Sequence, residues 1–105
     1  MTFIHEVTRA YCHPLRQEIL DVISEGRGRL GVCEIAVQIG EKQSNTSQHL
    51  GIMKKAGLLY VEPDRNDPRK YLYKKNYALL KVLEEFQMNL DDYEEEHELQ
   101  LLKTG

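Results

Sequence analysis

The segment from residue 40 to residue 57 constrains the fold most, because it sets a run of short polar residues inside a helical pattern. The run reads QSNTSQ over residues 43–48, and its serine, asparagine and threonine side chains are mediocre helix formers that compete for backbone hydrogen bonds. Thr46, Leu50 and Met53 recur at helical spacing, which predicts that they face the core. The polar residues between them then occupy the exposed face of the helix.

This exposed face carries hydrogen-bonding side chains and a glycine, namely Gln43, Ser44, Ser47, Gln48 and Gly51. The helical pattern before it ends at Gly40, and Ala36, four residues earlier, is small enough to let two helices cross closely. Two short helices joined by a tight turn are typical of a helix-turn-helix, whose second helix enters the DNA major groove. Glutamine can contact adenine through two hydrogen bonds, and serine can contact a base edge or a phosphate. Double-stranded DNA is therefore the predicted partner.

The remaining sequence predicts further helices and one hairpin. Residues 2–10 and 12–26 have amphipathic helical patterns, and Pro14 suits the first turn of the second one. The runs LLYVEP and KYLYKK read as strands, and DRNDPR between them has strong turn chemistry. Residues 77–102 contain neither glycine nor proline and read as a long helix. We therefore predict one mostly helical domain over residues 1–105, a winged helix-turn-helix with a small β-hairpin.

Basic residues lie at or near the tip of the predicted wing, residues 58–75, which directly follows the helix-turn-helix of residues 32–56. Side chains on such a ribbon can reach phosphates or the minor groove beside a recognition helix. An ordinary charged hairpin tip is the alternative. Together with the polar helix, the candidate DNA contacts are Lys42, Gln43, Ser44, Ser47, Gln48, Arg65, Arg69 and Lys70.

Charge is polarised along the chain, although the net charge is only −3 at pH 7. Residues 42–75 hold eight basic and three acidic side chains, whereas residues 81–105 hold two basic and eight acidic ones. This distribution favours DNA binding through the basic segment, with the acidic end kept away from DNA. The alternative is that both runs are ordinary solvated faces.

Four stretches of the sequence follow one another along the chain, namely HPLRQEIL, VCEIAVQIG, KQSNTSQHLGIMKKAGLL and RKYLYK. In the order and spacing of these stretches, the sequence resembles the ArsR/SmtB family of winged-helix repressors. The resemblance covers roughly residues 10–75. Its most specific piece, QSNTSQHL, is similar to the family's Gln-Ser-x-x-Ser-x-x-Leu recognition helix. The resemblance implies a homodimer held by terminal helices, repression that is released by a metal ion or an oxidant, and DNA contacts at Gln43, Ser44, Ser47 and Gln48.

Thiol chemistry is one hypothesis for sensing. The family's arsenic and cadmium sensors carry a Cys-Val-Cys box where this chain has Gly31, Val32 and Cys33, so one thiolate of the pair is missing. A soft-metal site needs two or three converging thiolates, and Cys12 is the only other cysteine. Sensing through Cys12 or Cys33 competes with the alternative that both are inert, half-buried packing residues.

The predicted C-terminal helix, residues 77–102, carries a heptad-like apolar seam, in which the candidate dimer contacts are Leu83, Phe86, Leu90 and Tyr93. Packing on the protein's own core is the alternative use of this seam. The same helix offers His97 with Asp91 and Glu94, but their spacing does not match the family's usual metal ligands. We therefore predict no metal and no other cofactor, and we expect a homodimer.

Other classes of protein fit the sequence less well. GRGRLG, residues 26–31, is a literal Gly-x-Gly-x-x-Gly, but it follows a helical pattern rather than a strand, so it predicts a loop and no dinucleotide site or enzyme. No apolar run approaches the roughly 20 residues of a membrane span, and no signal-peptide pattern occurs, so we expect a cytoplasmic protein. A winged helix used only for protein contacts is the remaining alternative, and it would carry apolar anchors on its exposed helix.

Overall fold

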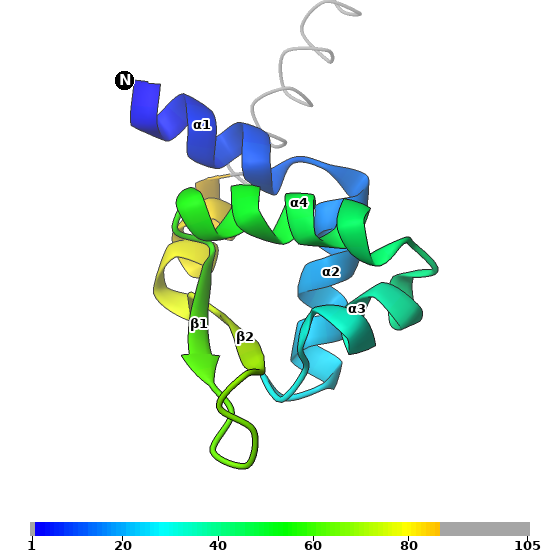
Figure 1. Ribbon diagram of the computed structural model, residues 1–105. Helices are drawn as coiled ribbons and strands as arrows, with labels where there is room; N and C mark the ends of the chain where they lie inside the picture. The colour runs from blue at the N-terminus through cyan, green and yellow to red at the C-terminus, as the bar shows by residue number, and fades with distance from the viewer. Residues whose placement is uncertain (1, 87–105) are drawn as a thin grey trace, which may run out of the picture.

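The computed structural model describes residues 2–86 and has the order of elements expected from the sequence (Figure 1). Its helices and strands are α1 (Thr2–Tyr11), α2 (Pro14–Glu25), α3 (Val32–Ile39), α4 (Gln43–Lys55), β1 (Leu59–Pro63) and β2 (Tyr71–Lys75). Helical backbone resumes at residue 77 and continues to residue 86, the last residue that the structure describes. Figure 1 shows α1 beside α4, and the hairpin extending away from the helices. The predicted winged helix-turn-helix is therefore confirmed.

Helix α2 begins and ends where the sequence signals predict. The N-cap His13 accepts a hydrogen bond from the Leu15 backbone N–H at its Nδ1, at 3.2 Å, and Pro14 occupies the first turn, where no backbone N–H is needed. At the other end, Gly26 is the C-cap. The apolar face of the helix is buried through Ile19, Leu20, Val22 and Ile23.

The turn between α3 and α4 depends on Gly40, whose φ of 70° lies in the left-handed region that glycine adopts without strain. Its backbone N–H donates to Val37 O at 3.3 Å, and the N–H of Glu41 donates to Ala36 O at 3.0 Å, which satisfies the last carbonyls of α3. Ala36 is buried, as the predicted close helix crossing requires. The turn thus fixes the angle between the two helices of the motif.

The buried side of α4 anchors it to the core. Thr46, Leu50 and Met53 are fully buried, as predicted from their spacing. The Thr46 hydroxyl donates to the backbone carbonyl of Lys42 at 2.9 Å, so the one buried polar side chain in this part of the protein is satisfied. Burial of one side leaves the opposite side of α4 as the exposed face.

The hairpin is antiparallel, with Leu59 opposite Lys75 and Pro63 opposite Tyr71. Its base is tied to the helices, because the Tyr73 N–H donates to Leu30 O at 3.0 Å. The side-chain Nδ2 of Asn76 also donates to Gly57 O at 2.9 Å. These bonds hold the base of the wing while its tip projects beyond the body of the protein.

The helical segment of residues 77–86 packs one side on the core. Leu83 is only 9% exposed and belongs to the core cluster, whereas Phe86 is 55% exposed. Of the predicted dimer contacts, Leu83 therefore packs within its own chain, and Leu90 and Tyr93 lie outside the described residues. No helix within residues 2–86 has the length and apolar character that crossing a membrane requires.

Candidate nucleic-acid interface

The outer face of α4 is polar and exposed. All the side chains that the sequence assigned to this face are exposed to solvent, namely those of Gln43, Ser44, Ser47 and Gln48. Gly51 is also exposed, and no atom lies within 4 Å of the Cβ that another residue would carry there. The result is a shallow helix surface on which short donors and acceptors stand clear of neighbouring elements.

The start of α4 is also open to a ligand. Lys42 is the N-cap, and its side chain makes no capping hydrogen bond. The first turn of the helix contains no acidic residue, but the carboxylate of Glu41, directly before the N-cap, accepts a hydrogen bond from Asn45 Nδ2 at 2.8 Å. Gln43 and Ser44 thus begin the polar face at the N-terminal end of α4.

The tip of the wing presents two exposed arginines, Arg65 and Arg69. Two aspartates shape this loop: Asp64 Oδ1 accepts the N–H of Asn66, and Asp67 Oδ1 accepts the N–H of Arg69, each at 3.0 Å. The ion pairs of the described residues involve neither arginine. Both guanidinium groups are therefore available to a phosphate.

Lys70 differs from these two arginines, because its ammonium forms an ion pair with Glu34 at the start of α3. Glu34 Oε2 also accepts the backbone N–H of Gly31 at 3.1 Å. The hydrogen bond from Lys70 lowers the pKa of the Glu34 carboxyl, and the same bond raises the pKa of Lys70. The predicted phosphate contact of Lys70 would require this pair to open or to be shared, so that contact stays a prediction.

Glu34 is a residue that the sequence reading missed. A signal for it was present, since Glu34 lies three residues after Gly31 at a helix start, the spacing of a capping box. Its partner in the wing, Lys70, follows 36 residues later, and no local sequence pattern reveals this pairing.

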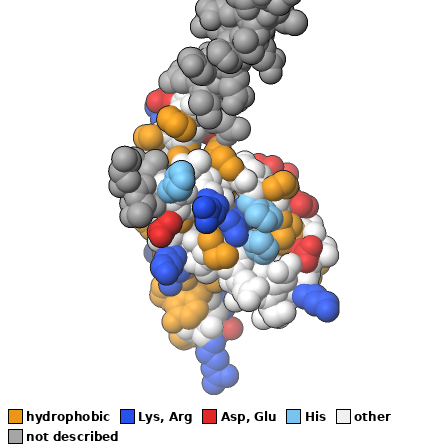
Figure 2. All heavy atoms as spheres, turned by 90° about the horizontal axis from the view of Figure 1, so that it is seen from above, with side chains coloured by type: hydrophobic (Ala, Val, Ile, Leu, Met, Phe, Trp, Pro, Cys, Tyr) orange, Lys and Arg blue, Asp and Glu red, His pale blue; other side chains and the backbone are white. Residues whose placement is uncertain are grey.

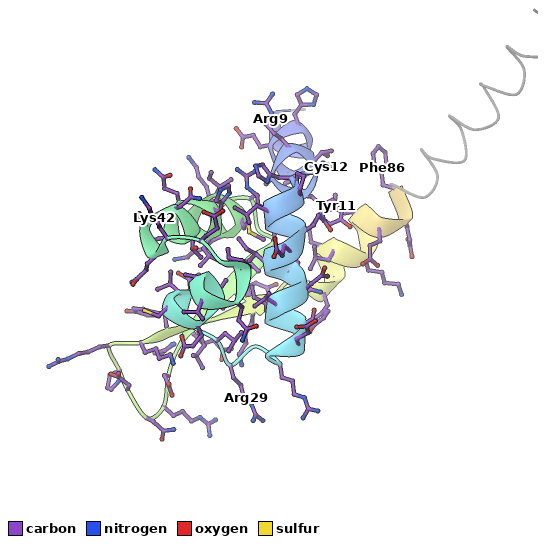
Figure 3. All side chains as sticks on the ribbon, turned by 90° about the vertical axis from the view of Figure 1, so that its right-hand side faces the viewer. Arg9, Tyr11, Cys12, Arg29, Lys42 and Phe86 are labelled. Carbon is purple, nitrogen blue, oxygen red and sulfur yellow. The ribbon has the colours of Figure 1, made fainter. Side chains whose placement is uncertain are left out.

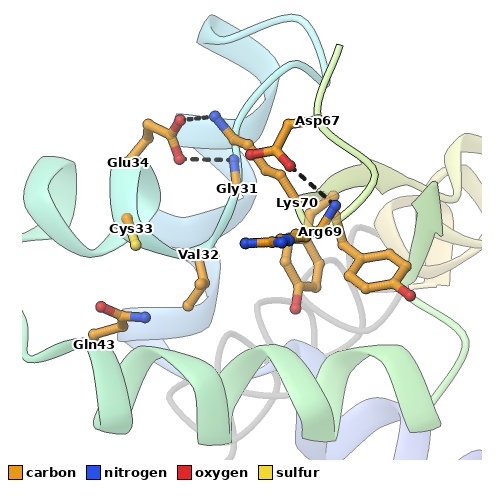
Figure 4. A pocket seen from close by; sticks show the side chains of 10 residues that line it. Gly31, Val32, Cys33, Glu34, Gln43, Asp67, Arg69 and Lys70 are labelled. Atoms are coloured by element: carbon orange, nitrogen blue, oxygen red, sulfur yellow. Dashed lines mark hydrogen bonds and ion pairs between the residues drawn. The ribbon is translucent and has the colours of Figure 1, made fainter. Parts of the chain in front are cut away.

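A hollow of about 460 Å³ separates the wing from the starts of α3 and α4 (Figure 4), and we call it the wing hollow. It is lined by Gln43 of α4, Arg69 of the wing and Cys33 of α3, among others. In Figure 4 the side chains of Gln43 and Arg69 extend toward this common space. The fold thus brings the first residue of the polar helix and a wing arginine, both predicted from sequence, to one site.

Both cysteines, Cys12 and Cys33, are exposed. The alternative that both are half-buried is therefore wrong, whereas thiol sensing stays a prediction. Cys33 is the second residue of α3 and lies on the outer side of that helix, next to buried Ile35 and Ala36, which fill the inner side. Cys12 lies in the short connection between α1 and α2, where the chain runs over the surface.

Within residues 5–86, no group of three or more histidine, cysteine, aspartate or glutamate side chains is placed to hold a metal ion. His97, Asp91 and Glu94, the alternative metal ligands considered from the sequence, lie outside the described residues.

The packed helices, a tight turn before a polar helix and an anchored β-hairpin define a winged helix-turn-helix protein. Residues 13–61 match the model of a family described as bacterial regulatory protein, arsR family. The match runs from the start of α2 into β1 and confirms the resemblance drawn from the sequence. The family is one of regulatory proteins, in agreement with the expectation that the chain is not an enzyme.

Known proteins resemble this chain in sequence or in fold. The uncharacterized HTH-type transcriptional regulator MJ1325 of Methanocaldococcus jannaschii is 37% identical over 54 residues, which are 51% of this chain and 60% of that protein. The homodimeric winged helix-turn-helix DNA-binding domain of Mb0332 from Mycobacterium bovis, a possible ArsR-family transcriptional regulator, has a TM-score of 0.68 at 20% identity, over 88% of this chain and 82% of that one. For Rv0081 of M. tuberculosis the TM-score is 0.63 at 26% identity, over 89% and 93% of the two chains.

Proposed function

We propose that this protein is a sequence-specific DNA-binding transcriptional regulator that acts as a homodimeric repressor on a palindromic operator. The observation that carries the proposal is the exposed polar face of α4, from Gln43 to Gly51, on a helix whose other side is locked into the core. A rigid helix with short hydrogen-bonding side chains suits the major groove, which is about 12 Å wide and admits one helix. The cytoplasmic location expected from the sequence stays a prediction.

Sequence would be read by the side chains on this face. Gln43 and Gln48 can each make two hydrogen bonds to an adenine, while Ser44 and Ser47 can contact a base edge or a phosphate. Gly51 keeps the helix surface low, so the backbone can approach the groove closely. The cost of a glycine inside a helix, about 0.5–1 kcal/mol, then has a functional reason.

Phosphate contacts from the wing would set the position of the helix without reading sequence. Arg65 and Arg69 carry guanidinium groups that suit phosphate oxygens, and the hydrogen bonds at the base of the hairpin hold them at a defined distance from α4. The ion pair between Lys70 and Glu34 adds a second anchor near the tip.

A dimer is proposed because one recognition helix reads too few base pairs for a unique operator. The structural relative Mb0332 is described as homodimeric. In this chain, Val82 and Phe86 are exposed apolar residues on the last described helical segment, and Leu90 and Tyr93 continue the same seam in the sequence. Two copies joined there would place two recognition helices on half-sites about one helical turn, 34 Å, apart.

The alternative is a winged helix that binds only proteins. Such a surface would offer apolar anchors at its centre. The outer face of α4 has none among Gln43, Ser44, Ser47 and Gln48, and Ile52 lies at its margin. The DNA interpretation is therefore favoured.

Selection of bound duplexes from a random DNA library tests the proposal. Enrichment of a palindromic site, bound more tightly than a scrambled duplex at two salt concentrations, is the expected result. Equal binding to all duplexes, or none, would favour the protein-interaction alternative.

A further inference from the structure

A second hollow, of about 310 Å³, lies between α1, α2 and α4, and we call it the basic hollow. Three cations line it, which are Arg9 of α1, Arg16 of α2 and Lys55 of α4, together with one carboxylate, Glu6. None of the three cations belongs to an ion pair in the part of the chain that the structure describes. Figure 2 shows this face of the protein, where arginine or lysine side chains gather beside histidines.

The guanidinium of Arg16 is held in place at this hollow. Its Nε donates to His49 Nδ1 at 3.2 Å, and its Nη1 donates to the backbone carbonyl of Arg9 at 3.4 Å. His49 is itself braced by the ring of His13, whose centroid lies 5.1 Å away. The Nη2 group of Arg16 has no hydrogen-bond partner among the described residues. A fixed guanidinium with free donors, beside two more cations, is suited to bind an anion.

The protonation state of His49 fits this arrangement. As the acceptor for Arg16, its Nδ1 must be unprotonated. Burial lowers the pKa of His49, and the positive charges of Arg16 and His13 lower it further, whereas Glu41 opposes them. The imidazole therefore serves as a neutral support for Arg16.

The two hollows lie on opposite sides of α4. Gln43 lines the wing hollow, and Ile52 lines the basic hollow. These residues are nine positions apart, which is about two and a half helical turns and thus half a rotation about the axis. Around the helix axis, Ser44 and Gln48 on the polar face lie between Gln43 and Ile52. A helix seated in the major groove has one sugar-phosphate strand along each flank, and each strand would face one of the hollows.

We infer that the basic hollow formed by Arg9, Arg16 and Lys55 binds backbone phosphates of DNA, on the strand opposite the one that the wing contacts. This inference rests on the proposed function and adds a second clamp to it. Phosphate contacts on both flanks fix the rotation of α4 in the groove, which a wing on one side alone would leave free.

The test measures how DNA affinity depends on salt. Each phosphate contact adds about one unit to the slope of log affinity against log salt. We expect Arg9→Ala, Arg16→Gln and Lys55→Ala each to lower the slope by about one, equally on selected and random duplexes. For each variant, the loss of affinity between about 50 and about 200 mM salt should be roughly fourfold smaller than for wild type.

Two control variants distinguish a specific phosphate site at the basic hollow from a general effect of the protein's net charge. Arg29→Ala removes an exposed arginine at the far end of α2 from Arg9 (Figure 3) and should leave the slope unchanged. Arg16→Lys keeps the charge but loses the guanidinium fork, so its slope should stay near that of wild type while its affinity falls. If Arg16→Gln reduces thermal stability, Arg9→Ala and Lys55→Ala still decide the question, since both side chains are exposed.

The outcomes distinguish this inference from the proposed function. If Arg69→Ala lowers the slope and the three hollow variants do not, the clamp is overturned and the DNA-binding function stands. If Arg29→Ala lowers the slope as much as they do, the effect is one of net charge and the inference is wrong. Tight binding of inorganic phosphate to wild type but not to Arg16→Gln would assign the hollow to a small anion instead. A wild type that binds no DNA overturns both.

Discussion

The carboxylate of Glu34 joins the wing to the helix-turn-helix, because it accepts hydrogen bonds from both the Lys70 ammonium and the backbone N–H of Gly31. One side chain thus caps α3 and restrains the hairpin. Both partners of the ion pair are partly exposed, and such pairs contribute little to overall stability. The main consequence is therefore local, in the position of the wing.

Glu34→Gln should loosen the wing while leaving the fold intact. We expect faster amide hydrogen exchange at the wing residues nearest Lys70 and only a small loss in the free energy of unfolding. Glu62→Gln is the matched control, since Glu62 pairs with Lys74 within the hairpin itself and does not reach α3. Equal exchange rates in the Glu34 variant and wild type would show that the pair does not hold the wing.

The pKa shifts give this contact a pH window. The pKa of Glu34 is lowered by its hydrogen bond from Lys70, so its contribution is complete above the ordinary glutamate pKa and is lost as pH falls through the lowered value. The pKa of Lys70 is raised, so its contribution is lost only as pH rises through that raised value. Wing protection in wild type should therefore be constant near neutral pH and decline in acid, while Glu34→Gln shows no such decline.

Substitutions at two glycines distinguish the effect of backbone strain on stability from the effect of the fit between α4 and DNA on binding. A Cβ at either Gly40 or Gly51 would meet no atom within 4 Å, but Gly40 has a φ of 70° and Gly51 lies inside α4. Gly40→Ala should lower the free energy of unfolding by about 1–2 kcal/mol, and Gly51→Ala should raise it by about 0.5–1 kcal/mol. If α4 lies deep in the groove, Gly51→Ala should nevertheless weaken DNA binding. A stabilised variant with undiminished affinity would mean that the helix does not approach DNA at this point.

Truncation tests the proposed dimer. A chain that ends after residue 84 keeps the core residues Leu80 and Leu83 but loses Phe86, Leu90 and Tyr93. We expect it to fold, to sediment as a monomer, and to bind palindromic DNA about 100-fold or more weakly, because the linked second contact is lost. A truncated chain that still sediments as a dimer would place the interface elsewhere, for example on α1.

The exposure of both cysteines makes the thiol-sensing hypothesis more specific. Cys33 lines the wing hollow with Gln43 and Arg69, so an adduct there would occupy space at the proposed DNA surface. Peroxide or persulfide, which can modify a single thiol, should weaken operator binding of wild type and of Cys12→Ser, but not of Cys33→Ser. If the double variant Cys12→Ser, Cys33→Ser responds like wild type, the response does not depend on thiols.

Local patterns were sufficient to predict most of the fold. Helical spacing identified Thr46, Leu50 and Met53 as buried, because burial of one helix side repeats with the helical period. Gly40 marked the turn for another local reason, because glycine adopts the left-handed backbone conformation that the turn requires.

Features that depend on distant segments were not predictable. The sequence gives no sign that Lys70 would pair with Glu34, since 36 residues separate them. It also could not tell that Leu83 packs on its own chain while Phe86, at heptad spacing, is exposed. The basic hollow was missed because its cations come from three helices, and Arg9 and Arg16 lie outside the basic segment of the sequence.

The most direct test of the central claim, that the outer face of α4 reads DNA sequence, is a comparison of dissociation constants on the selected duplex and a scrambled one. Gln43→Ala and Ser47→Ala should each lose about 1–3 kcal/mol of binding to the selected duplex and almost none to the scrambled one. Gln38→Ala, which removes an exposed glutamine from α3, is the matched control and should retain the preference of wild type. If the Gln43 and Ser47 variants keep the full preference for the selected duplex, the recognition surface is not the outer face of α4.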